Sequence, residues 1–156
     1  MKLVPPQDDM MDAAAQMWWR GWHDGHASIV PEGLTRLRTL ANFRQRLDLH
    51  RAATSFAVED GAVRGLFMLE DGELEQFYVH PEARGTGLAA WLMTGAEDAL
   101  RAQGHRAAWL ACSVGNARAA RFYEKAAWTY TRTESLNAET SAGPFPLDVW
   151  RYEKTL

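Results

Sequence analysis

The feature that most constrains the fold is a change of hydrophobic period across a turn that contains two glycines. Apolar residues alternate up to Val79, as in a strand, and recur at helical spacing from Leu88 onward. The turn between them ends in Arg84-Gly85-Thr86-Gly87-Leu88-Ala89. A strand that turns into a helix in this way indicates a fold that mixes both elements, with free backbone N–H groups at the start of the helix.

Two Asp-Gly turn signals before this point predict antiparallel strands. Asp60-Gly61 separates the strand-like segments 55–59 and 63–69, and Asp71-Gly72 separates the second of these from residues 74–79. Such short connections can join only antiparallel neighbours. We therefore expect a three-stranded meander that leads into the glycine turn.

The second half of the chain predicts a return to the same sheet. The apolar run 107–112 follows the helix and is expected to pair in parallel after its crossover. Strands at about 128–134 and 149–154 flank a loop that contains Gly143, Pro144 and Pro146. Together these segments predict an α/β (α+β) fold with a mixed, mostly antiparallel central sheet flanked by helices.

Three further helices are expected from periodicity and caps. Asp8 or Asp9 is placed as the cap of a first helix that runs through Trp22, and a second helix is expected over residues 34–47. Asn116 is a natural N-cap for a helix that carries Phe122 and Tyr123. The first third of the chain therefore reads as helical.

Composition sets limits on the class of protein. The 156 residues suit one domain, and 47% hydrophobic with 24% charged residues is ordinary for a globular core. A net charge of −3 argues against binding to nucleic acid, and no run approaches the roughly 20 apolar residues that cross a bilayer. The start, Met1 to Asp9, lacks the apolar core of a signal peptide, and the single cysteine, Cys112, suits a reducing compartment. We expect a cytoplasmic protein.

The glycine turn predicts an anion site. Glycines let the backbone approach a ligand closely, and the helix dipole and Arg84 both attract phosphate. A nucleotide P-loop is excluded because no Gly-Lys-Ser/Thr follows. The letters Gly85-Thr86-Gly87-Leu88-Ala89-Ala90 satisfy a dinucleotide fingerprint, but no Asp or Glu occurs between His105 and Gly115 to bind a ribose, and the preceding strands are antiparallel.

The sequence resembles the GNAT superfamily of acyl-CoA-dependent N-acetyltransferases. The segment from Val79 to Ala89 matches that family's central motif, Q/R-x-x-G-x-G/A after a strand ending in Val-x-Pro. The segment from Asn116 to Lys125 is similar to its next motif. Ala127 stands where a glycine is usual, which affects the turn after the helix but removes no catalytic atom.

The resemblance implies acetyl-CoA as co-substrate and places it on named residues. Its pyrophosphate would lie on the loop Arg84, Gly85, Thr86, Gly87, Leu88 and Ala89, and its pantetheine arm along the backbone of Tyr78 and Val79. Asn116 would add a hydrogen bond to that arm, beside its role as a helix cap. Residues 1–156 would form a single N-acetyltransferase domain: residues 1–50 on the acceptor side, 54–135 as the acetyl-CoA-binding core and 136–156 as a C-terminal strand region.

The resemblance also implies a general acid and a general base. Tyr123 would protonate the departing thiolate, although an aromatic at this spacing can also be part of the core. The base would come from the strand before the glycines, where alternation places Glu73, Glu75, Phe77 and Val79 on one face. Glu75 is the first choice and Glu73 the second, against a reading of both as solvated carboxylates.

Other candidates are weaker. Trp18, Trp22, His23 and His26 are expected mainly in the core, with an acceptor pocket as the alternative, and no third ligand suggests a metal beside the histidines. Cys112 reads as a small buried hydrophobe, not a nucleophile.

The predicted reaction is direct transfer of an acetyl group from acetyl-CoA to a primary amine of a small molecule or peptide, without a metal. The alternatives are a non-catalytic acyl-CoA-binding domain of the same fold and, third, a dinucleotide-binding oxidoreductase. The resemblance also leaves a homodimer open.

Overall fold

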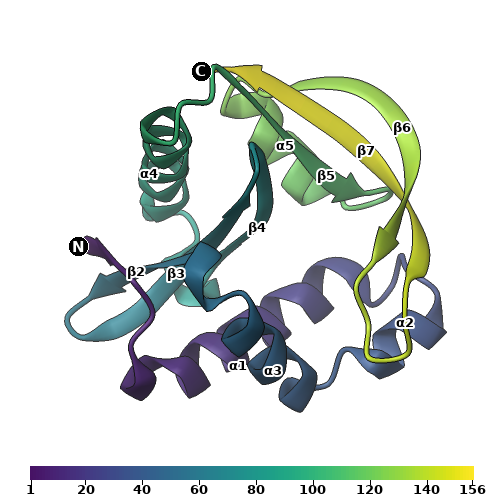
Figure 1. Cartoon of the computed structure of the whole chain (residues 1–156), viewed down its shortest axis with the longest axis horizontal. Coiled ribbons are helices and arrows are strands. Elements are labelled where there is room, and N and C mark those ends of the chain that lie inside the picture. The colour runs from purple at the N-terminus through teal and green to yellow at the C-terminus, as the bar shows by residue number, and fades with distance from the viewer.

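The computed structural model describes all residues from Met1 to Leu156, and its strands form one sheet (Figure 1). The sheet has seven strands in the order β1-β2-β3-β4-β5-β7-β6. The strands are β1 (Lys2–Val4), β2 (Thr54–Glu59), β3 (Ala62–Glu70), β4 (Glu73–Val79), β5 (Ala107–Ser113), β6 (Thr129–Ala138) and β7 (Phe145–Thr155). The α-helices are α1 (Met11–His26), α2 (Glu32–Leu37), α3 (Leu40–Leu49), α4 (Leu88–Ala102) and α5 (Ala117–Lys125). Three short 3₁₀ turns lie at Asp8–Met10, Arg51–Ala53 and Pro81–Ala83.

The pairing confirms the predicted mixed sheet. Only β4 and β5 are parallel, and every other neighbouring pair is antiparallel. The predicted meander is β2-β3-β4, and α4 is the crossover helix that makes the parallel pair. β1 was not expected from the sequence, because three residues are too few to carry a period.

The sheet is opened in the middle, between β4 and β5. These strands are in register only at Glu73 and Trp109, where the Trp109 N–H donates to the Gly72 carbonyl at 3.2 Å. From Glu73 toward Val79 the two strands diverge, as Figure 1 shows. The edge of β4 that faces β5 therefore lacks a strand partner over most of its length, and its backbone groups there are free to bind a ligand.

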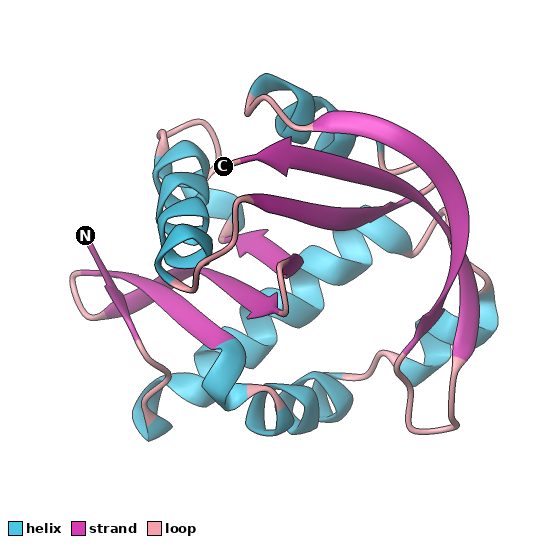
Figure 2. Cartoon of the chain, turned by 45° about the horizontal axis from the view of Figure 1, so that its top comes forward, coloured by secondary structure: helices cyan, strands magenta, loops and turns pink.

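Helices cover both faces of the first half of the sheet (Figure 2). One core cluster lies between α1, α3 and the strands β2 and β3, and includes the fully buried Trp18, Phe43 and Phe56. The other lies around α4, where Leu92 and Leu100 have no exposed surface. Burial of side chains of this size stabilises the fold by about 1.5–3 kcal/mol each. The helix stripe predicted from Leu88 to Leu100 is thus confirmed as a core face.

The predicted helices differ from the observed ones at two points. Asp8 and Asp9 do not cap α1, because they form a 3₁₀ turn that precedes it. The second helix is divided into α2 and α3 at Arg38, whose backbone (φ −89°, ψ 59°) is not helical. The side chain of Thr39 then caps α3 by accepting from the Asn42 N–H at 3.1 Å. The apolar residues continue at helical spacing across this break, so the hydrophobic period alone could not predict it.

A β-bulge in β4 corrects the predicted alternation. Gln76 pairs with Met68 and Leu74 with Leu69, which leaves Glu75 as the extra residue. Phe77 packs on the α4 side, where its ring stacks on Phe122 at 5.5 Å. Glu75 instead lies on the opposite face, near residues of α3. The prediction that Glu73, Glu75, Phe77 and Val79 share one face is therefore wrong, because one inserted residue reverses the order of faces.

The C-terminal hairpin is longer than the sequence indicated. Residues 145 and 146 lie in β7 and not in a loop, and Pro146 pairs with Asn137 of β6. Proline is tolerated there because β7 joins β5 only from Val149 onward, so that Pro146 has a strand neighbour on one side only. The end of the hairpin reaches α2, where the ring of Phe145 lies close to Gly33. None of the helices has the length and apolar composition needed to cross a membrane.

Candidate active site

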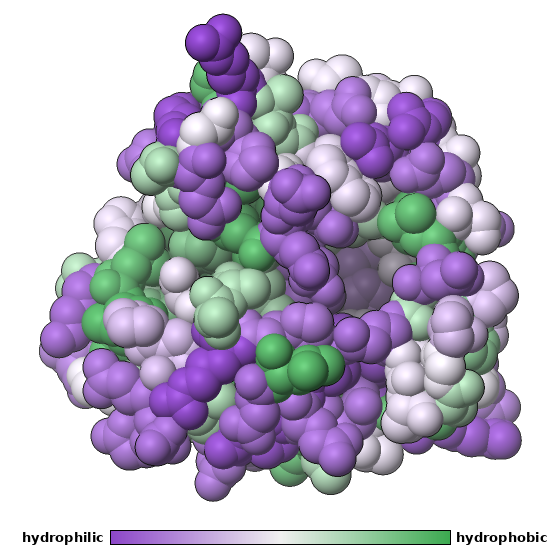
Figure 3. Space-filling model, in the orientation of Figure 1, coloured by the Kyte–Doolittle hydropathy of each residue, from purple (hydrophilic) through white to green (hydrophobic).

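The opening between β4 and β5 leads into one large cavity. It has a volume of about 650 Å³ and is lined by residues of α1, β4, β5, α5 and the β6–β7 hairpin. Figure 3 shows the surface hollowed at this place, right of the centre of the view. A cavity of this size suits a small-molecule site.

The glycine turn lies at one end of the cavity. Gly85 and Gly87 have positive φ angles of 77° and 88°, and a Cβ added at either would meet no atom within 4 Å. Gly87 is the N-cap of α4 and offers no side chain to its first N–H groups. These groups are therefore left to bind an anion.

The predicted loop residues do not all face the cavity. Arg84, Gly85 and Ala89 line it. The Thr86 hydroxyl donates to the Ala83 carbonyl and thereby holds the turn, and the side chain of Leu88 is buried in the core. Any contact of Leu88 with a ligand is thus restricted to its backbone.

Arg84 has one ionic partner within the protein. Its Nη2 lies 3.6 Å from Oδ2 of Asp24 on α1, and both side chains are more than a third exposed. Such an exposed and loose pair contributes little to stability. The guanidinium can therefore exchange this carboxylate for a phosphate.

The predicted pantetheine residues lie along the open edge. Tyr78 and Val79 line the cavity where β4 has left β5, and Asn116 lines it from the start of α5. Asn116 Oδ1 accepts from the Ala119 N–H at 3.4 Å, which confirms the predicted cap. Its Nδ2 is directed toward Gly25 of α1 and has no hydrogen-bond partner in the protein. The residues present fit a chain of amides with a diphosphate at one end.

Tyr123 lies on α5 with its ring among other aromatic rings. It packs 5.7 Å from Phe122 and 6.1 Å from Tyr152, and it lines the cavity. Burial raises the pKa of its hydroxyl, and no group of the protein accepts a hydrogen bond from it. A neutral phenol of this kind can donate its hydrogen to an anion that forms in the cavity. Tyr123 therefore packs against the core and also lines the cavity, and its role as the general acid stays a prediction.

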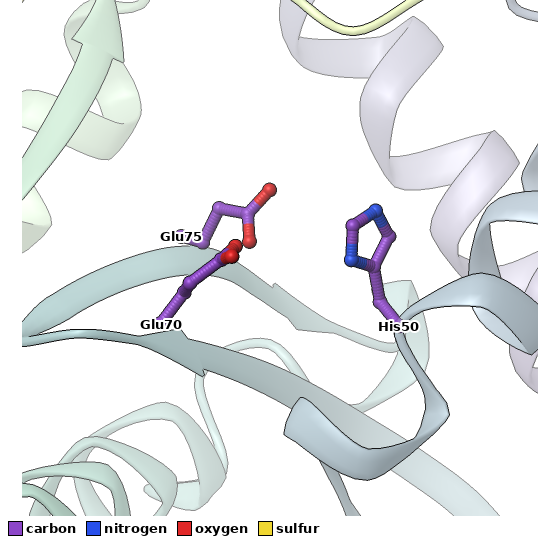
Figure 4. A group of neighbouring side chains, drawn as sticks. All are labelled: His50, Glu70 and Glu75. Atoms are coloured by element: carbon purple, nitrogen blue, oxygen red, sulfur yellow. The ribbon is translucent and has the colours of Figure 1, made fainter.

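The two carboxylates predicted as bases lie on another wall of the cavity. Burial, with the charges of Glu75 and Glu70 nearby, raises the pKa of Glu73 to about 7. Burial and a hydrogen bond with Glu70 raise the pKa of Glu75. Figure 4 shows the Glu70 and Glu75 carboxylates converging, with the His50 ring facing them. A carboxylate with a pKa near neutrality is suited to accept a proton at physiological pH.

Three donor atoms from His50, Glu70 and Glu75 lie within 4.8 Å of one another, which is a set that a divalent cation can use. The positive charge of Arg46 acts on Glu75 from the same side, and His50 Nε2 already lies 3.0 Å from Glu139. Both features disfavour a cation, and the absence of a metal stays a prediction.

Sequence reasoning missed the residues that line the far end of the cavity. Arg38, Arg46 and Glu70 lie there, and their positions depend on the helix break and the hairpin turn. Of the tryptophan and histidine cluster, Trp18 is core, whereas Trp22 and His26 line the cavity. The only available signal was the presence of four arginines in the segment 34–47 that was expected to form one helix, and the sequence did not indicate which of them would be buried.

Cys112 is confirmed as a buried residue. Its side chain lines the cavity from β5, and burial raises the pKa of its thiol to about 12. A thiol with this pKa holds almost no thiolate at neutral pH.

The chain was compared with known proteins. The family model described as "Acetyltransferase (GNAT) family" matches residues 16–128. An uncharacterised N-acetyltransferase of Mycobacterium tuberculosis is 36% identical over 119 residues, which cover 72% of this chain and 74% of the relative.

Solved structures show the same fold. A GCN5-related N-acetyltransferase from Rhodopseudomonas palustris has a TM-score of 0.76 and 19% identity, with 99% of this chain and 95% of that chain covered. The PaiA N-acetyltransferase from Thermoplasma acidophilum, solved with coenzyme A, has a TM-score of 0.69 and 14% identity over 99% and 98%. Since the family model covers well over half of the chain and the relative exceeds 30% identity, this protein is an N-acetyltransferase of the GNAT family.

Proposed function

We propose that this N-acetyltransferase transfers an acetyl group from acetyl-CoA directly to a primary amine, and that residues 1–156 act as one domain in the cytoplasm. The observation that carries the proposal is that one cavity joins the glycine turn, the free edge of β4, Tyr123 and a pair of carboxylates. A ligand that lies along the open edge therefore passes from an anion site to groups that can move protons.

Acetyl-CoA would supply an activated thioester carbonyl. The loop from Arg84 to Ala89 would hold its diphosphate, and Tyr78, Val79 and Asn116 would bind the amides of its arm. These assignments rest on the position of each residue along the cavity. All of these residues belong to the segment 54–135, which we propose as the acetyl-CoA-binding core.

The protein's own groups would handle one proton at each end of the reaction. Glu75, with Glu73 as the second choice, would take a proton from the ammonium group of the acceptor. The amine nitrogen then forms a bond to the acetyl carbon as the bond from carbon to sulfur breaks. Tyr123 would donate a hydrogen bond and then a proton to the sulfur. The nitrogen of the ammonium group loses two protons in all: the first goes to the glutamate before attack and leaves to solvent, and the second leaves as the bond to carbon forms and replaces the proton that Tyr123 gives to the sulfur.

Direct transfer is favoured over an acyl-enzyme route. The only cysteine in the cavity is Cys112, and its high pKa makes it a poor nucleophile. The acetyl group would therefore pass directly between the two substrates without a covalent acyl-enzyme intermediate.

The test replaces Tyr123 by phenylalanine and follows thiol release from acetyl-CoA with a panel of amines. We expect kcat to fall about 100–1,000-fold, because the hydroxyl acts only when charge forms on sulfur. Binding of acetyl-CoA, measured as a rise in melting temperature, should stay unchanged.

The matched control is Tyr130→Phe, which makes the same chemical change on an exposed ring outside the cavity. It should leave kcat unchanged. Equal kcat in Tyr123→Phe and wild type would remove Tyr123 from the mechanism. Stabilisation by acetyl-CoA without transfer to any amine would favour the non-catalytic alternative, and stabilisation by NADH alone would overturn the proposal.

A further inference from the structure

Two arginines are buried at the far end of the cavity. Arg38 is 3% exposed and lies at the break between α2 and α3, and Arg46 is 8% exposed and lies on α3. Both line the same cavity as the carboxylates of β4. Burial of a guanidinium is costly unless its N–H groups are paired, so each buried arginine must be accounted for.

Arg38 has few partners within the protein. Its Nη1 donates to Asn42 Oδ1 at 3.2 Å, and its guanidinium lies 5.9 Å from the ring of Trp22. Its Nε is buried and has no partner. No carboxylate lies within 4 Å of this side chain. An arginine offers five N–H donors, and most of those on Arg38 are unused.

Arg46 is still less satisfied. Its guanidinium stacks on the ring of Trp18 at 4.5 Å, and both its Nε and its Nη1 are buried without a hydrogen bond. The one carboxylate within 4 Å is that of Glu139, whose Oε1 lies 3.8 Å from Nε. That side chain is half exposed and is bound to His50 at 3.0 Å. The contact is therefore too long and too solvated to satisfy Arg46.

The two buried arginines leave hydrogen-bond donors unused. Burial, together with the charge of Arg46, lowers the pKa of Arg38 to about 10. The charges of Glu139 and Glu75 attract Arg46, but neither carboxylate makes a hydrogen bond to it. An anion with two acceptor oxygens would fill the unused N–H groups of the two arginines.

We propose that the acceptor carries a carboxylate close to its amine, as a free amino acid does, and that Arg38 and Arg46 bind this carboxylate. The proposal rests on the proposed function and names the class of acceptor. The planar fork of arginine matches a carboxylate in a two-point contact. Glu75 is close enough to Arg46 for their charges to attract, so an amine next to the bound carboxylate would be near a candidate base.

The size of the cavity supports a small acceptor. Its 650 Å³ must hold the end of the pantetheine arm as well as the acceptor. The β6–β7 hairpin borders the arginine end with Leu136, Ala138 and Leu147, which gives the side chain of an amino acid an apolar wall. A peptide N-terminus has no carboxylate at this distance from its amine and would leave both arginines unpaired.

The experiment compares the twenty free amino acids with their C-terminal amides, as acceptors for acetyl-CoA in a thiol-release assay on the full chain. The amides keep the amine and the side chain but lack the charge. We expect at least one free acid to react with a kcat/KM roughly 10–100-fold above that of its amide, the range for a charge-assisted hydrogen bond.

The arginine itself is tested with Arg46→Met, which keeps most of the apolar stem over Trp18. We expect KM for the free acid to rise roughly 10–100-fold with KM for acetyl-CoA unchanged, so that the preference for the acid over the amide is lost. The variant should melt no lower than wild type, because it removes a buried unpaired charge. A merely structural Arg46 would instead lower the melting temperature and affect acid and amide alike.

Arg44→Met is the matched control. Arg44 lies on the same helix but is partly exposed and pairs with Asp12 and Asp48 outside the cavity. It should leave the preference for the acid unchanged. The proposal is wrong if the amides react at the same rate as the acids. It is also wrong if no free amino acid reacts and none raises the melting temperature in the presence of coenzyme A. Failure of the proposed function appears separately, as an absence of thiol release with every amine.

Discussion

At the scale of single residues, Glu70 adds to the effect of burial on the two candidate bases. It lies opposite Glu73 across the β3–β4 ladder, and its carboxylate lies beside that of Glu75. Its negative charge raises the pKa of both carboxyl groups, in addition to the effect of burial. Below these pKa values the bases hold a proton and cannot accept another.

We therefore expect kcat/KM to rise with pH through an apparent pKa above the ordinary value of a carboxyl group, because burial and the charge of Glu70 raise the pKa of Glu75 and of Glu73. Replacing Glu70 by glutamine removes a like charge and should move this rise to lower pH. Glu75→Gln should instead lower the rate about 100-fold at every pH, because it removes the first-choice base. A profile that stays in place in Glu70→Gln would contradict this account of the carboxylates.

At the scale of elements, the turn after α5 explains how the chain tolerates an alanine in place of the family's glycine. The N–H of Ala127 donates to the Glu124 carbonyl and that of Trp128 to the Tyr123 carbonyl, at 3.0 and 2.9 Å. This is the Schellman pattern, which requires a left-handed residue, and Ala127 has φ 67°. The turn is therefore the one that glycine would form, and it keeps the helix that carries Tyr123 in place.

We expect Ala127→Gly to raise the free energy of unfolding by about 0.5–1 kcal/mol. Glycine removes the strain that alanine has in the left-handed conformation, which stabilises the folded state. It also increases the backbone entropy of the unfolded chain, which offsets part of that gain. Urea denaturation measures it. Ala126→Gly is the control, because its φ of −82° suits alanine and the same change there should destabilise. A loss of stability in Ala127→Gly would mean that the turn is not strained.

At the scale of the whole molecule, one buried ion pair links the two halves of the opened sheet. Lys154 of β7 donates to Glu97 of α4 at 2.6 Å and to the Ala126 carbonyl at the end of α5 at 2.8 Å. The Glu97 side chain is 9% exposed and that of Lys154 is 19% exposed. Because β4 and β5 pair at only one position, this contact helps to fix the distance between the two halves of the sheet.

We expect Glu97→Ala to lower the free energy of unfolding by about 3 kcal/mol, because it leaves the Lys154 ammonium buried with only a carbonyl. Thermal denaturation gives the loss. Asp98→Ala is the matched control, since Asp98 pairs with Arg101 on the exposed face of the same helix and should change stability by less than about 0.5 kcal/mol. Equal effects of the two variants would show that the buried pair does not hold the halves together.

The order of elements could be predicted from the sequence because it depends on local patterns. Asp60-Gly61 and Asp71-Gly72 fixed the meander, the stripe from Leu88 fixed the crossover helix, and Asn116 marked the start of α5. The glycine turn before α4 could also be predicted, since positive φ angles favour glycine. Tyr123 and the carboxylates were found through the family motif and a strand pattern.

Tertiary structure alone decided which of these groups meet and what faces them. The bulge at Glu75 depends on how β4 pairs with β3, and it moves this carboxylate to the side of α3, away from Phe77. Arg38 and Arg46 become a pair only through a helix break that tertiary packing selects. Local sequence thus determined the elements and the glycine turn, because their energies come from near neighbours in the chain. The proposed acceptor end was decided by contacts between residues far apart in sequence, which leave no period or motif to read.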